Sequence, residues 1–552
     1  MKSLSRFRPH PFQFLGLGLV LALLLAVACG AAATATPAPP AAKAAAPTPT
    51  LPFRVAATPS PVPPVVATKP AVDRLKVAMT PPAVQSTIGW LGARSSMGQV
   101  SAMYEGLVYE NNTTGNFDPM MATQWELSKD AMTLRWKLRK GIPFHTGKEF
   151  TAKDVVFTYE RVTGQDSVHS NVGRWKELIK SKDLFEIVND YEIVLHCSTP
   201  CFEAPFFSSE SKGGHIYSKD QWDATGGTTK GYADNPTGTG PFRFREFKEG
   251  QHIRFKRLEK HWRVVPDFKE LQIFYVPEAS TRLAQLLAGE VHISEIDRSL
   301  KAEVLKRGLK VESSTLPGIS AAIFFGGNHI SEKDVKGPLS NKLVRQALNL
   351  AFDRKAIQET IFGGDGELQQ TPMVHSTDEV FISTWKLYPY DPVKAKELLA
   401  QAGYPNGFSM DLWTAVYPGA PELPQVAEAA ATMWAKIGVK TKIIDSEFGK
   451  IRDRYRSRTF TGTEAFTFRG GLNPAFQQLQ SHLASPAVAG GPLHTFEDPF
   501  LDANFRKFLD SNDVAERTRL QREMTDFSYK NYANVPLLWL GGLAGINPKV
   551  VV

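Results

Sequence analysis

The chain has 552 residues, with 64 Lys and Arg against 56 Asp and Glu, and its formal net charge is +8. Six of the basic residues and none of the acidic ones fall within the first 71 positions, so the remainder of the chain carries only +2. A nearly neutral body without a sustained basic stripe argues against binding of nucleic acid. The length is too great for a single hydrophobic core, and we expect two or three domains.

The N-terminus has the features of an export signal. Basic side chains within residues 2–8 precede an apolar run over residues 14–28, which is shorter than the about 20 residues of a membrane-spanning helix. The run ends in small residues directly before Cys29, as at the cleavage site of a bacterial lipoprotein. We therefore expect residues 1–28 to be a signal peptide and Cys29 to carry a lipid anchor. The alternative is an ordinary secretory signal with an unmodified cysteine.

Residues 29–71 follow the signal and are dominated by Ala, Pro, Thr and Val. They contain no acidic residue and no periodic apolar pattern. Such a segment cannot bury enough apolar surface to offset the entropy that is lost on ordering. We therefore expect a disordered, partly polyproline tether that holds the folded body away from the membrane surface.

The first half of the body alternates between strand and helix patterns. Thr151 and Asp154 have the spacing of a capping box and predict the start of a helix. Short apolar or alternating runs predict strands on both sides of this helix. These strands are expected at residues 75–79, 132–138, 191–195, 242–247 and 252–258.

Two cysteines lie in this half, Cys197 and Cys201, close together in the chain. In an oxidising compartment this spacing favours a local disulfide bond. The alternatives are two free buried thiols or a metal site that also uses His196 or His215. The spacing of these side chains matches no standard set of metal ligands, and we expect no metal site.

The second half has the clearest helix boundaries. Asp391 and Pro392 begin a helix whose apolar residues recur at i, i+3, i+4 and i+7 before Gly403 ends it. A second apolar stripe at residues 426–437 is followed by a glycine and an alternating strand at residues 439–443. Helix, glycine and strand in this order form the repeating unit of an α/β sheet. The body is therefore predicted to be α/β.

Short characteristic stretches follow one another along the body. They are Tyr-Glu-Gly-Leu-Val at 104–108, Leu-Arg-Lys-Gly-Ile-Pro-Phe-His-Thr-Gly at 138–147, the segment 151–161, Gly-Thr-Gly-Pro-Phe at 238–242, Val-Arg-Gln-Ala-Leu-Asn at 344–349, the segment 390–399 and Asn-Val-Pro-Leu at 534–537. In this order they resemble family 5 of the extracytoplasmic solute-binding proteins, the peptide/nickel type that serves ABC transporters.

The resemblance implies a two-lobed α/β fold of the periplasmic-binding-protein type (type II, with an extra inserted domain) and a ligand site between the lobes. The chain would cross between the lobes near residues 320–325 and 535–540. The expected parts are domain I at 72–118, 235–318 and 526–552, an inserted domain II at 119–234, and domain III, the second lobe, at 319–525. Closure about the hinge would bury the solute, because only the closed form contacts it from both sides.

The resemblance also implies binding without catalysis and without a cofactor. The expected partners are a small solute, the permease subunits of an ABC importer, and the membrane through the lipid on Cys29. The protein would act as a monomer outside the cytoplasm. Oligopeptides, amino-acid derivatives, oligosaccharides and metal chelates all suit such a fold, and the sequence does not choose among them.

Candidate ligand contacts lie just after predicted strands, where α/β lobes bind their ligands. They are Trp90 and Arg94 after the first strand, Trp413 and Tyr417 after residues 408–412, and Phe468, Arg469 and Asn473 after Phe466. For each aromatic residue the alternative is ordinary packing in the core.

Asn473 stands directly before a proline. At this point the peptide-binding members of the family carry an aspartate that pairs with the α-amino group of the ligand. A neutral amide supplies no counter-charge, and Arg469 nearby would repel an ammonium group. We therefore expect unmodified peptides to bind poorly, unless another carboxylate, such as Glu464 or Asp411, replaces the missing one.

Two other functions fit parts of the sequence. Ser-x-x-Lys occurs at 209–212 and 383–386, a pattern of exported serine enzymes, but no Lys-Thr-Gly or Gly-x-Ser-x-Gly accompanies it. A lipoprotein that senses a ligand or acts as a scaffold without a transporter is the other alternative.

Overall fold

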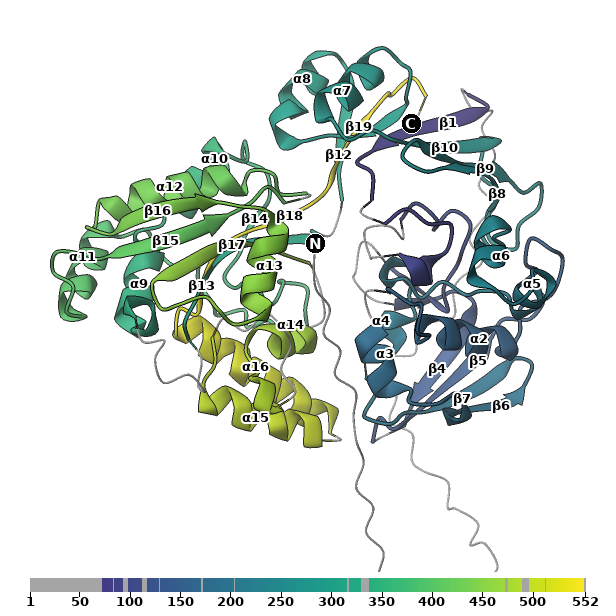
Figure 1. The fold of residues 1–552 in the computed structure, drawn as a ribbon, viewed down its shortest axis with the longest axis horizontal. Coiled ribbons are helices and arrows are strands. Elements are labelled where there is room, and N and C mark those ends of the chain that lie inside the picture. Colours follow the sequence, from purple (N-terminus) through teal and green to yellow (C-terminus); the bar gives the residue numbers. More distant parts are fainter. Residues whose placement is uncertain are drawn as a thin grey trace, which may run out of the picture. The chain divides into compact units, whose positions relative to one another are not determined.

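The computed structural model describes residues 72–550, except positions 83, 93–97, 112–116, 129, 170–171, 203, 315–316, 329–336, 418, 472–474, 489–495 and 512. Within that range the strands form four sheets, with helices between them along the chain (Figure 1). The predicted α/β class is confirmed. None of the helices in this range is both long enough and apolar enough to cross a membrane. The predicted signal peptide, the tether and Cys29 lie outside the described residues.

The first large sheet has seven strands. Their order is β12 (Lys310–Ser313), β19 (Leu543–Ile546), β11 (Ile293–Glu295), β1 (Arg74–Met79), β10 (Glu270–Tyr275), β9 (His252–Arg257) and β8 (Phe242–Lys248). The central strand β1 runs parallel to both of its neighbours, whereas the outer pairs are antiparallel. The helical segments beside it are α7 (Ala279–Leu287), η4 (Arg298–Leu300) and α8 (Lys301–Lys306).

A smaller antiparallel sheet lies in the chain between β1 and β8. Its strands are, in order, β4 (Ala122–Leu127), β5 (Thr133–Leu138), β7 (Glu192–His196) and β6 (Phe185–Asn189), and a two-stranded sheet of β2 (Val108–Glu110) and β3 (Phe117–Pro119) precedes it. The helical segments of this region are η1 (Gly89–Leu91), α2 (Ala152–Val162), α3 (Val172–Leu178), η2 (Lys182–Leu184), α4 (Ala204–Phe207), η3 (Glu210–Lys212), α5 (Lys219–Ala224) and α6 (Thr229–Asp234). Helix α2 begins with the predicted capping box of Thr151 and Asp154.

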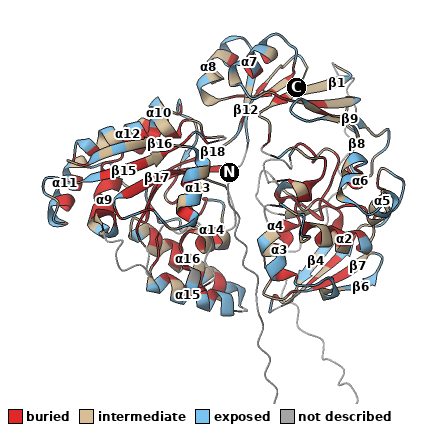
Figure 2. Ribbon diagram, in the orientation of Figure 1, coloured by how far each residue is buried: buried red, intermediate tan, exposed pale blue. Residues whose placement is uncertain are grey.

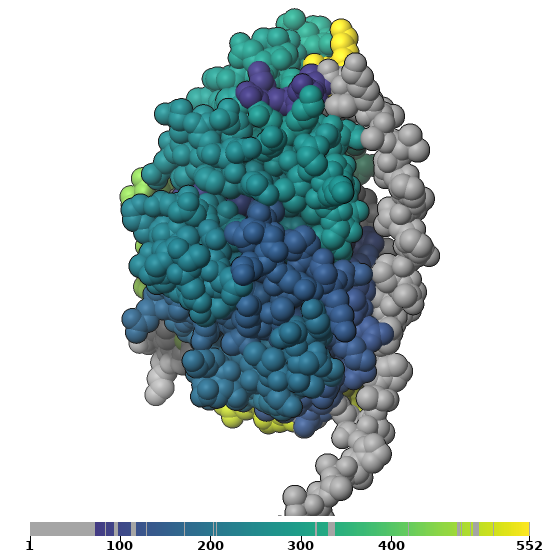
Figure 3. All heavy atoms as spheres, turned by 90° about the vertical axis from the view of Figure 1, so that its right-hand side faces the viewer, coloured from purple at the N-terminus to yellow at the C-terminus, as the bar shows by residue number. Residues whose placement is uncertain are grey.

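A continuous buried core joins these sheets. Leu134 and Trp136 of β5 belong to the same apolar cluster as Ile253 and Phe255 of β9. We call this part of the molecule the first lobe. Figure 3 shows its surface, where residues of β1 in purple lie beside teal residues from much later in the chain, as the pairing of β1 with β10 requires.

The second large sheet has six strands. Their order is β14 (Glu367–Leu368), β18 (Asn534–Leu540), β13 (Ile319–Phe325), β17 (Glu464–Gly471), β15 (Ser409–Thr414) and β16 (Lys440–Asp445). Its helical segments are η5 (Pro338–Ser340), α9 (Lys342–Leu350), α10 (Arg354–Thr360), α11 (Pro392–Gln401), α12 (Leu423–Ala435) and α13 (Phe448–Arg456). Strands β13 and β18 are buried over their whole length, as their red colour in Figure 2 shows.

Three further helices build a separate apolar cluster beside this sheet. They are α14 (Ala475–His482), α15 (Pro499–Asp510) and α16 (Val514–Lys530), with the short η6 (Pro486–Val488). Their core includes Leu479, Phe505 and Leu520. The six-stranded sheet and these helices form what we call the second lobe.

The crossings between the two large sheets differ from the prediction. The segments 320–325 and 535–540, predicted as crossings, lie in β13 and β18, which are hydrogen-bonded neighbours in the six-stranded sheet. The chain instead passes to the second sheet after β12 ends at Ser313 and before β13 begins at Ile319, and it returns between the end of β18 at Leu540 and the start of β19 at Leu543. Residues 526–540 therefore belong with the second lobe and not with domain I. Uninterrupted apolar runs such as these form the buried centre of a sheet, where both faces are covered.

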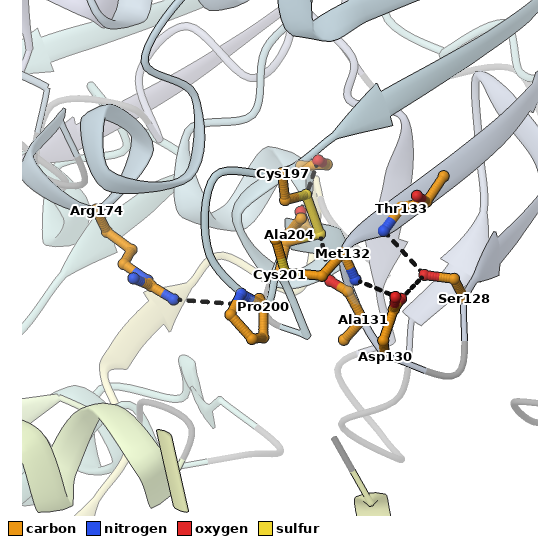
Figure 4. The surroundings of a disulfide bond; sticks show 11 residues. Ser128, Asp130, Ala131, Met132, Thr133, Arg174, Cys197, Pro200, Cys201 and Ala204 are labelled. Atoms are coloured by element: carbon orange, nitrogen blue, oxygen red, sulfur yellow. Dashed lines mark hydrogen bonds between the residues drawn. A yellow bond between two sulfur atoms is a disulfide. The ribbon is translucent and has the colours of Figure 1, made fainter. Parts of the chain in front are cut away.

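Cys197 and Cys201 are joined by a disulfide bond at the end of β7, with their Cα atoms 6.1 Å apart (Figure 4). The peptide N–H groups of both cysteines donate to backbone carbonyls of the neighbouring turn, at Met132 and Ala131. The disulfide thus closes a short loop that is already held against the turn joining β4 and β5.

Candidate ligand-binding site

The two large sheets share one topological feature. In the first lobe β1 lies between β11 and β10, and in the second lobe β15 lies between β17 and β16, each running parallel to both neighbours. Along the chain the central strand comes first (β1 or β15), and the neighbour on one side follows (β10 or β16). The chain then passes to the neighbour on the other side (β11 or β17). This order creates a switch point, and open α/β sheets bind ligands outside the carboxyl ends of the strands there.

Arg298 follows the carboxyl end of β11 and contacts the second lobe. Its side chain is only 7% exposed. One guanidinium nitrogen, Nη1, donates to the carbonyl oxygen of Gly419 at 3.3 Å, and Nη2 donates to the carbonyl oxygen of Gly541 in the crossing segment. A planar guanidinium can serve several acceptors at once, which suits it to this junction. Arg298 therefore connects the first lobe, the crossing segment and the loop that follows β15.

Glu422 lies at the end of that loop, where it is the N-cap residue of α12. Its side chain is 7% exposed, and Oε1 is 3.7 Å from Nη1 of Arg298. This distance allows electrostatic attraction but is too long for a hydrogen bond. Within the described part of the chain neither carboxylate oxygen has a hydrogen-bond partner. Burial raises the pKa of Glu422, while Arg298 acts in the opposite direction.

Gly419 brings the same loop close to the start of β13. Its φ of +79° is in the left-handed region that favours glycine. A Cβ atom at this position would lie 2.5 Å from Cδ1 of Ile319 and 3.8 Å from Nη2 of Arg469. The loop therefore passes directly over the hinge end of β13 and beside Arg469, so that Arg298, Glu422 and Arg469 come from three separate parts of the chain to one edge.

A small hollow adjoins Arg298 on the side of the crossing segments. Its volume is about 180 Å³, and Ser313, Asp365, Trp539 and Gly541 are among the residues that line it. Typical pockets for organic ligands measure about 300–1,000 Å³. We therefore do not assign the solute to this hollow.

The model of the bacterial extracellular solute-binding proteins, family 5, matches residues 116–469. The chain belongs to this family. Heme-binding protein A of Haemophilus influenzae is 30% identical over 472 residues, which are 81% of this chain and 83% of that protein. The dipeptide-binding protein of Escherichia coli is 31% identical over 370 residues, 64% of this chain and 68% of that protein. The solved structure of HbpA2 from Haemophilus parasuis is similar with a TM-score of 0.71 and 26% identity, over 86% of this chain and 96% of that one.

These likenesses give the family 5 protein the two-lobed fold of type II periplasmic binding proteins. The predicted family and fold are thereby confirmed. The family consists of solute-binding proteins that act outside the cytoplasm.

Two of the predicted contacts, Tyr417 and Phe468, pack inside the second lobe of this solute-binding protein. Tyr417 is 2% exposed, and its hydroxyl donates to the carbonyl oxygen of Thr467 at 2.7 Å. Phe468 is 6% exposed and stacks on Phe324 with ring centroids 4.4 Å apart. Both side chains support the sheet edge beside Arg469 rather than presenting an open surface.

Trp413 belongs to a polar network. Its indole N–H donates to Oε1 of Glu464 at 3.1 Å, and the guanidinium of Arg454 lies over its ring at 4.6 Å from the centroid. Arg454 also pairs with Glu464 at 2.7 Å, and Thr461 donates to the same carboxylate from its backbone N–H. Glu464 is thus already engaged at the amino end of β17, away from the carboxyl edge.

Asp411 lies in the first half of β15, opposite Glu464 in the neighbouring strand. Asp411 and Glu464 were the two carboxylates considered as replacements for the missing aspartate. Neither of them lies at the carboxyl ends of the strands. Glu422 does lie there.

Trp90 is fully buried in an aromatic cluster of the first lobe. Its ring centroid lies 4.6 Å from that of Tyr217, 5.5 Å from that of Tyr232 and 6.2 Å from that of Trp222. These contacts are those of a packed core residue, and a contact of Trp90 with the solute stays a prediction. Arg94 and Asn473 lie outside the described residues, and their contact with a solute stays a prediction.

Arg298 and Glu422 were not predicted from the sequence. Each follows a strand, as the predicted contacts do, but Glu422 comes eight residues after Thr414, the last residue of β15. The useful signal was the order of strands around β1 and β15, which becomes visible only once their pairing is known.

Proposed function

We propose that this protein captures a small organic solute outside the cytoplasm and delivers it to the permease of an ABC importer, anchored to the membrane by lipid on Cys29. The observation that carries the proposal is the meeting of Arg298 and Glu422. Each follows the carboxyl end of a switch-point strand in a different lobe, and their side chains are 3.7 Å apart. Two lobes that bring such edges together can bury a solute by closing about the crossing segments.

The names of the relatives favour an organic solute of moderate size. One relative is called a heme-binding protein and another a dipeptide-binding protein. Closure would be selected because only the closed form contacts the solute from both sides, and the permease would recognise that form.

A thermal-shift screen of the full-length protein tests this proposal. The panel contains short peptides, amino-acid derivatives, oligosaccharides and metal chelates, including heme. A ligand present at 100 times its Kd stabilises the folded state by about 2.7 kcal/mol, which gives a measurable rise in Tm. We expect one class to stabilise the protein. A protein whose Tm rises with none of these classes would favour a scaffold without a transported solute.

A further inference from the structure

The two lobes also touch at a place that lies apart from Arg298 and the crossings. Phe202 follows β7 in the chain and belongs to the first lobe, whereas Arg517 lies in helix α16 of the second lobe. The guanidinium carbon of Arg517 is 3.8 Å from the centroid of the Phe202 ring. A cation attracts the face of an aromatic ring when it lies within about 6 Å of the ring centroid. A cation–π contact therefore joins the lobes here.

Arg517 is held in position by its own lobe. Its side chain is buried, and Nη1 donates to the carbonyl oxygen of Phe508 near the C-terminal end of α15 at 2.7 Å. The same guanidinium lies over the ring of Phe508, 3.7 Å from the centroid. These contacts are made within the second lobe and do not depend on Phe202. A cation that is already positioned loses little further freedom when a second ring approaches it.

Phe202 is positioned by the loop that the disulfide closes (Figure 4). It directly follows Cys201, which belongs to the buried core of the first lobe. The backbone N–H of Cys201 donates to the carbonyl oxygen of Ala131 at 2.8 Å, and the N–H of Ala204 donates to the carbonyl oxygen of Cys201 at 3.0 Å. The backbone on both sides of Phe202 is therefore fixed, and the ring is presented from a rigid loop.

Arg517 lies on the side of the second lobe that faces away from the crossings. Figure 1 shows α15 and α16 on the opposite side of this lobe from α10 and α12. The crossing from β18 to β19 is on the α10 side, because Gly541 lines a hollow together with Asp365, which follows α10. A rotation about the crossings displaces the most distant parts of a lobe farthest. Opening of the lobes would therefore separate Arg517 from Phe202.

We propose that Phe202 and Arg517 form a latch that favours the closed arrangement of the lobes, whichever solute the protein takes. The latch raises the share of closed molecules when no solute is present, and the contacts of the solute complete the closure. It is also reversible, because water hydrates the guanidinium when the ring moves away. The disulfide between Cys197 and Cys201 then has a role in closure, since it fixes the loop that presents the ring.

Small-angle X-ray scattering of the full-length protein without solute measures the effect of the latch on closure. Phe202→Leu keeps an apolar side chain but removes the aromatic ring, whereas Phe202→Tyr retains the ring. The ratio of closed to open molecules should fall about tenfold in Phe202→Leu, and its radius of gyration should exceed that of the wild type. Phe202→Tyr should keep the wild-type radius. So should the matched control Phe500→Leu, which changes a ring of α15 that stacks on Phe527 within the second lobe.

Photo-crosslinking detects the contact itself and decides the matter even if Phe202→Leu does not fold. The photoreactive amino acid p-benzoylphenylalanine replaces Phe202 in the full-length protein, and mass spectrometry maps the products of irradiation without solute. We expect cross-links from position 202 to α15 or α16. The same amino acid in place of Ile187, which is exposed on β6 of the first lobe, should give none to these helices.

Two results would overturn the latch. One is the absence of cross-links from position 202 to α15 and α16. The other is an equal radius of gyration for the wild type and folded Phe202→Leu, which would show that the contact forms without holding the lobes together. Because both experiments omit the solute, failure of the latch leaves the proposed capture of a solute untouched.

Discussion

Arg298 and Glu422 show how single side chains from opposite lobes come to share one site. The Nη atoms of Arg298 donate to the carbonyl oxygens of Gly419 and Gly541. Lysine could not hold this geometry, because its ammonium is a single point of donation on a flexible stem. With Arg298 fixed by these carbonyls, Glu422 receives a positive field without a direct hydrogen bond. The Glu422 carboxylate is therefore held by charge attraction to Arg298, and its oxygens accept no hydrogen bond from the described residues.

Cys29 carries the proposed contact with the membrane. Replacing it by alanine removes the thiol that would be lipidated, and each buried CH₂ of a lipid chain contributes about 0.8 kcal/mol to membrane binding. We expect Cys29→Ala to move the protein from the membrane fraction to the soluble fraction in cell fractionation. Thr36→Ala in the following segment serves as a control and should stay with the membranes. A Cys29→Ala protein that still requires detergent for its release would contradict lipidation at this residue.

At the scale of elements, local signals predicted boundaries well. Asp391 caps α11 by accepting from the backbone N–H of Lys394 at 2.8 Å, and the capping box of Thr151 and Asp154 begins α2. These signals act over three or four residues and need no tertiary context. The lobe crossings were predicted too far into β13 and β18, because an apolar run alone does not reveal which strands it pairs with.

The site was harder to predict than the helices, for the same reason. Trp90 follows a strand and has the chemistry of a ligand contact, but Tyr217 and Tyr232 of later segments bury it completely. Arg298 and Glu422 meet only because both large sheets place a switch point next to the crossings. Long-range pairing of this kind is not contained in local sequence patterns.

Three buried histidines in the first lobe make its stability depend on pH. Burial lowers the pKa of His145 and of His169 to about 4 and that of His215 to about 3. The unfolded chain binds these protons near pH 6.5, before the folded state does. The contribution of these three groups is therefore full above pH 6.5 and falls by about 1.4 kcal/mol per pH unit for each histidine as the pH drops towards 4. Burial also raises the pKa of Glu210 to about 7 and that of Asp154 to about 6, and these two carboxyl groups act in the opposite direction.

Urea unfolding of the full-length protein at pH 7 and pH 5 measures this dependence. His215→Gln removes one of these titrations, and the change in stability between pH 7 and pH 5 should then differ from that of the wild type by roughly 2 kcal/mol, in the direction of a smaller loss at pH 5. His196→Gln changes an exposed histidine and should leave the loss as it is in the wild type. A His215→Gln variant with the same pH dependence as the wild type would show that this group does not link protonation to folding.

At the scale of the whole molecule, two short crossings connect the lobes. One joins β12 to β13 and the other joins β18 to β19, and Arg298 donates to the carbonyl oxygen of Gly541 in the second of them. A solute that fills the edge between Arg298 and Glu422 would contact both lobes at once. By linkage, any such differential contact shifts the population towards the closed arrangement.

Solute binding is expected to close the two lobes, and small-angle X-ray scattering measures this closure in solution. The radius of gyration of the full-length protein is measured during titration with the solute class that raises its Tm in the thermal-shift screen. We expect the radius of gyration to decrease and to saturate at the concentration at which calorimetric binding saturates. A radius that stays constant while the solute binds stoichiometrically would contradict closure.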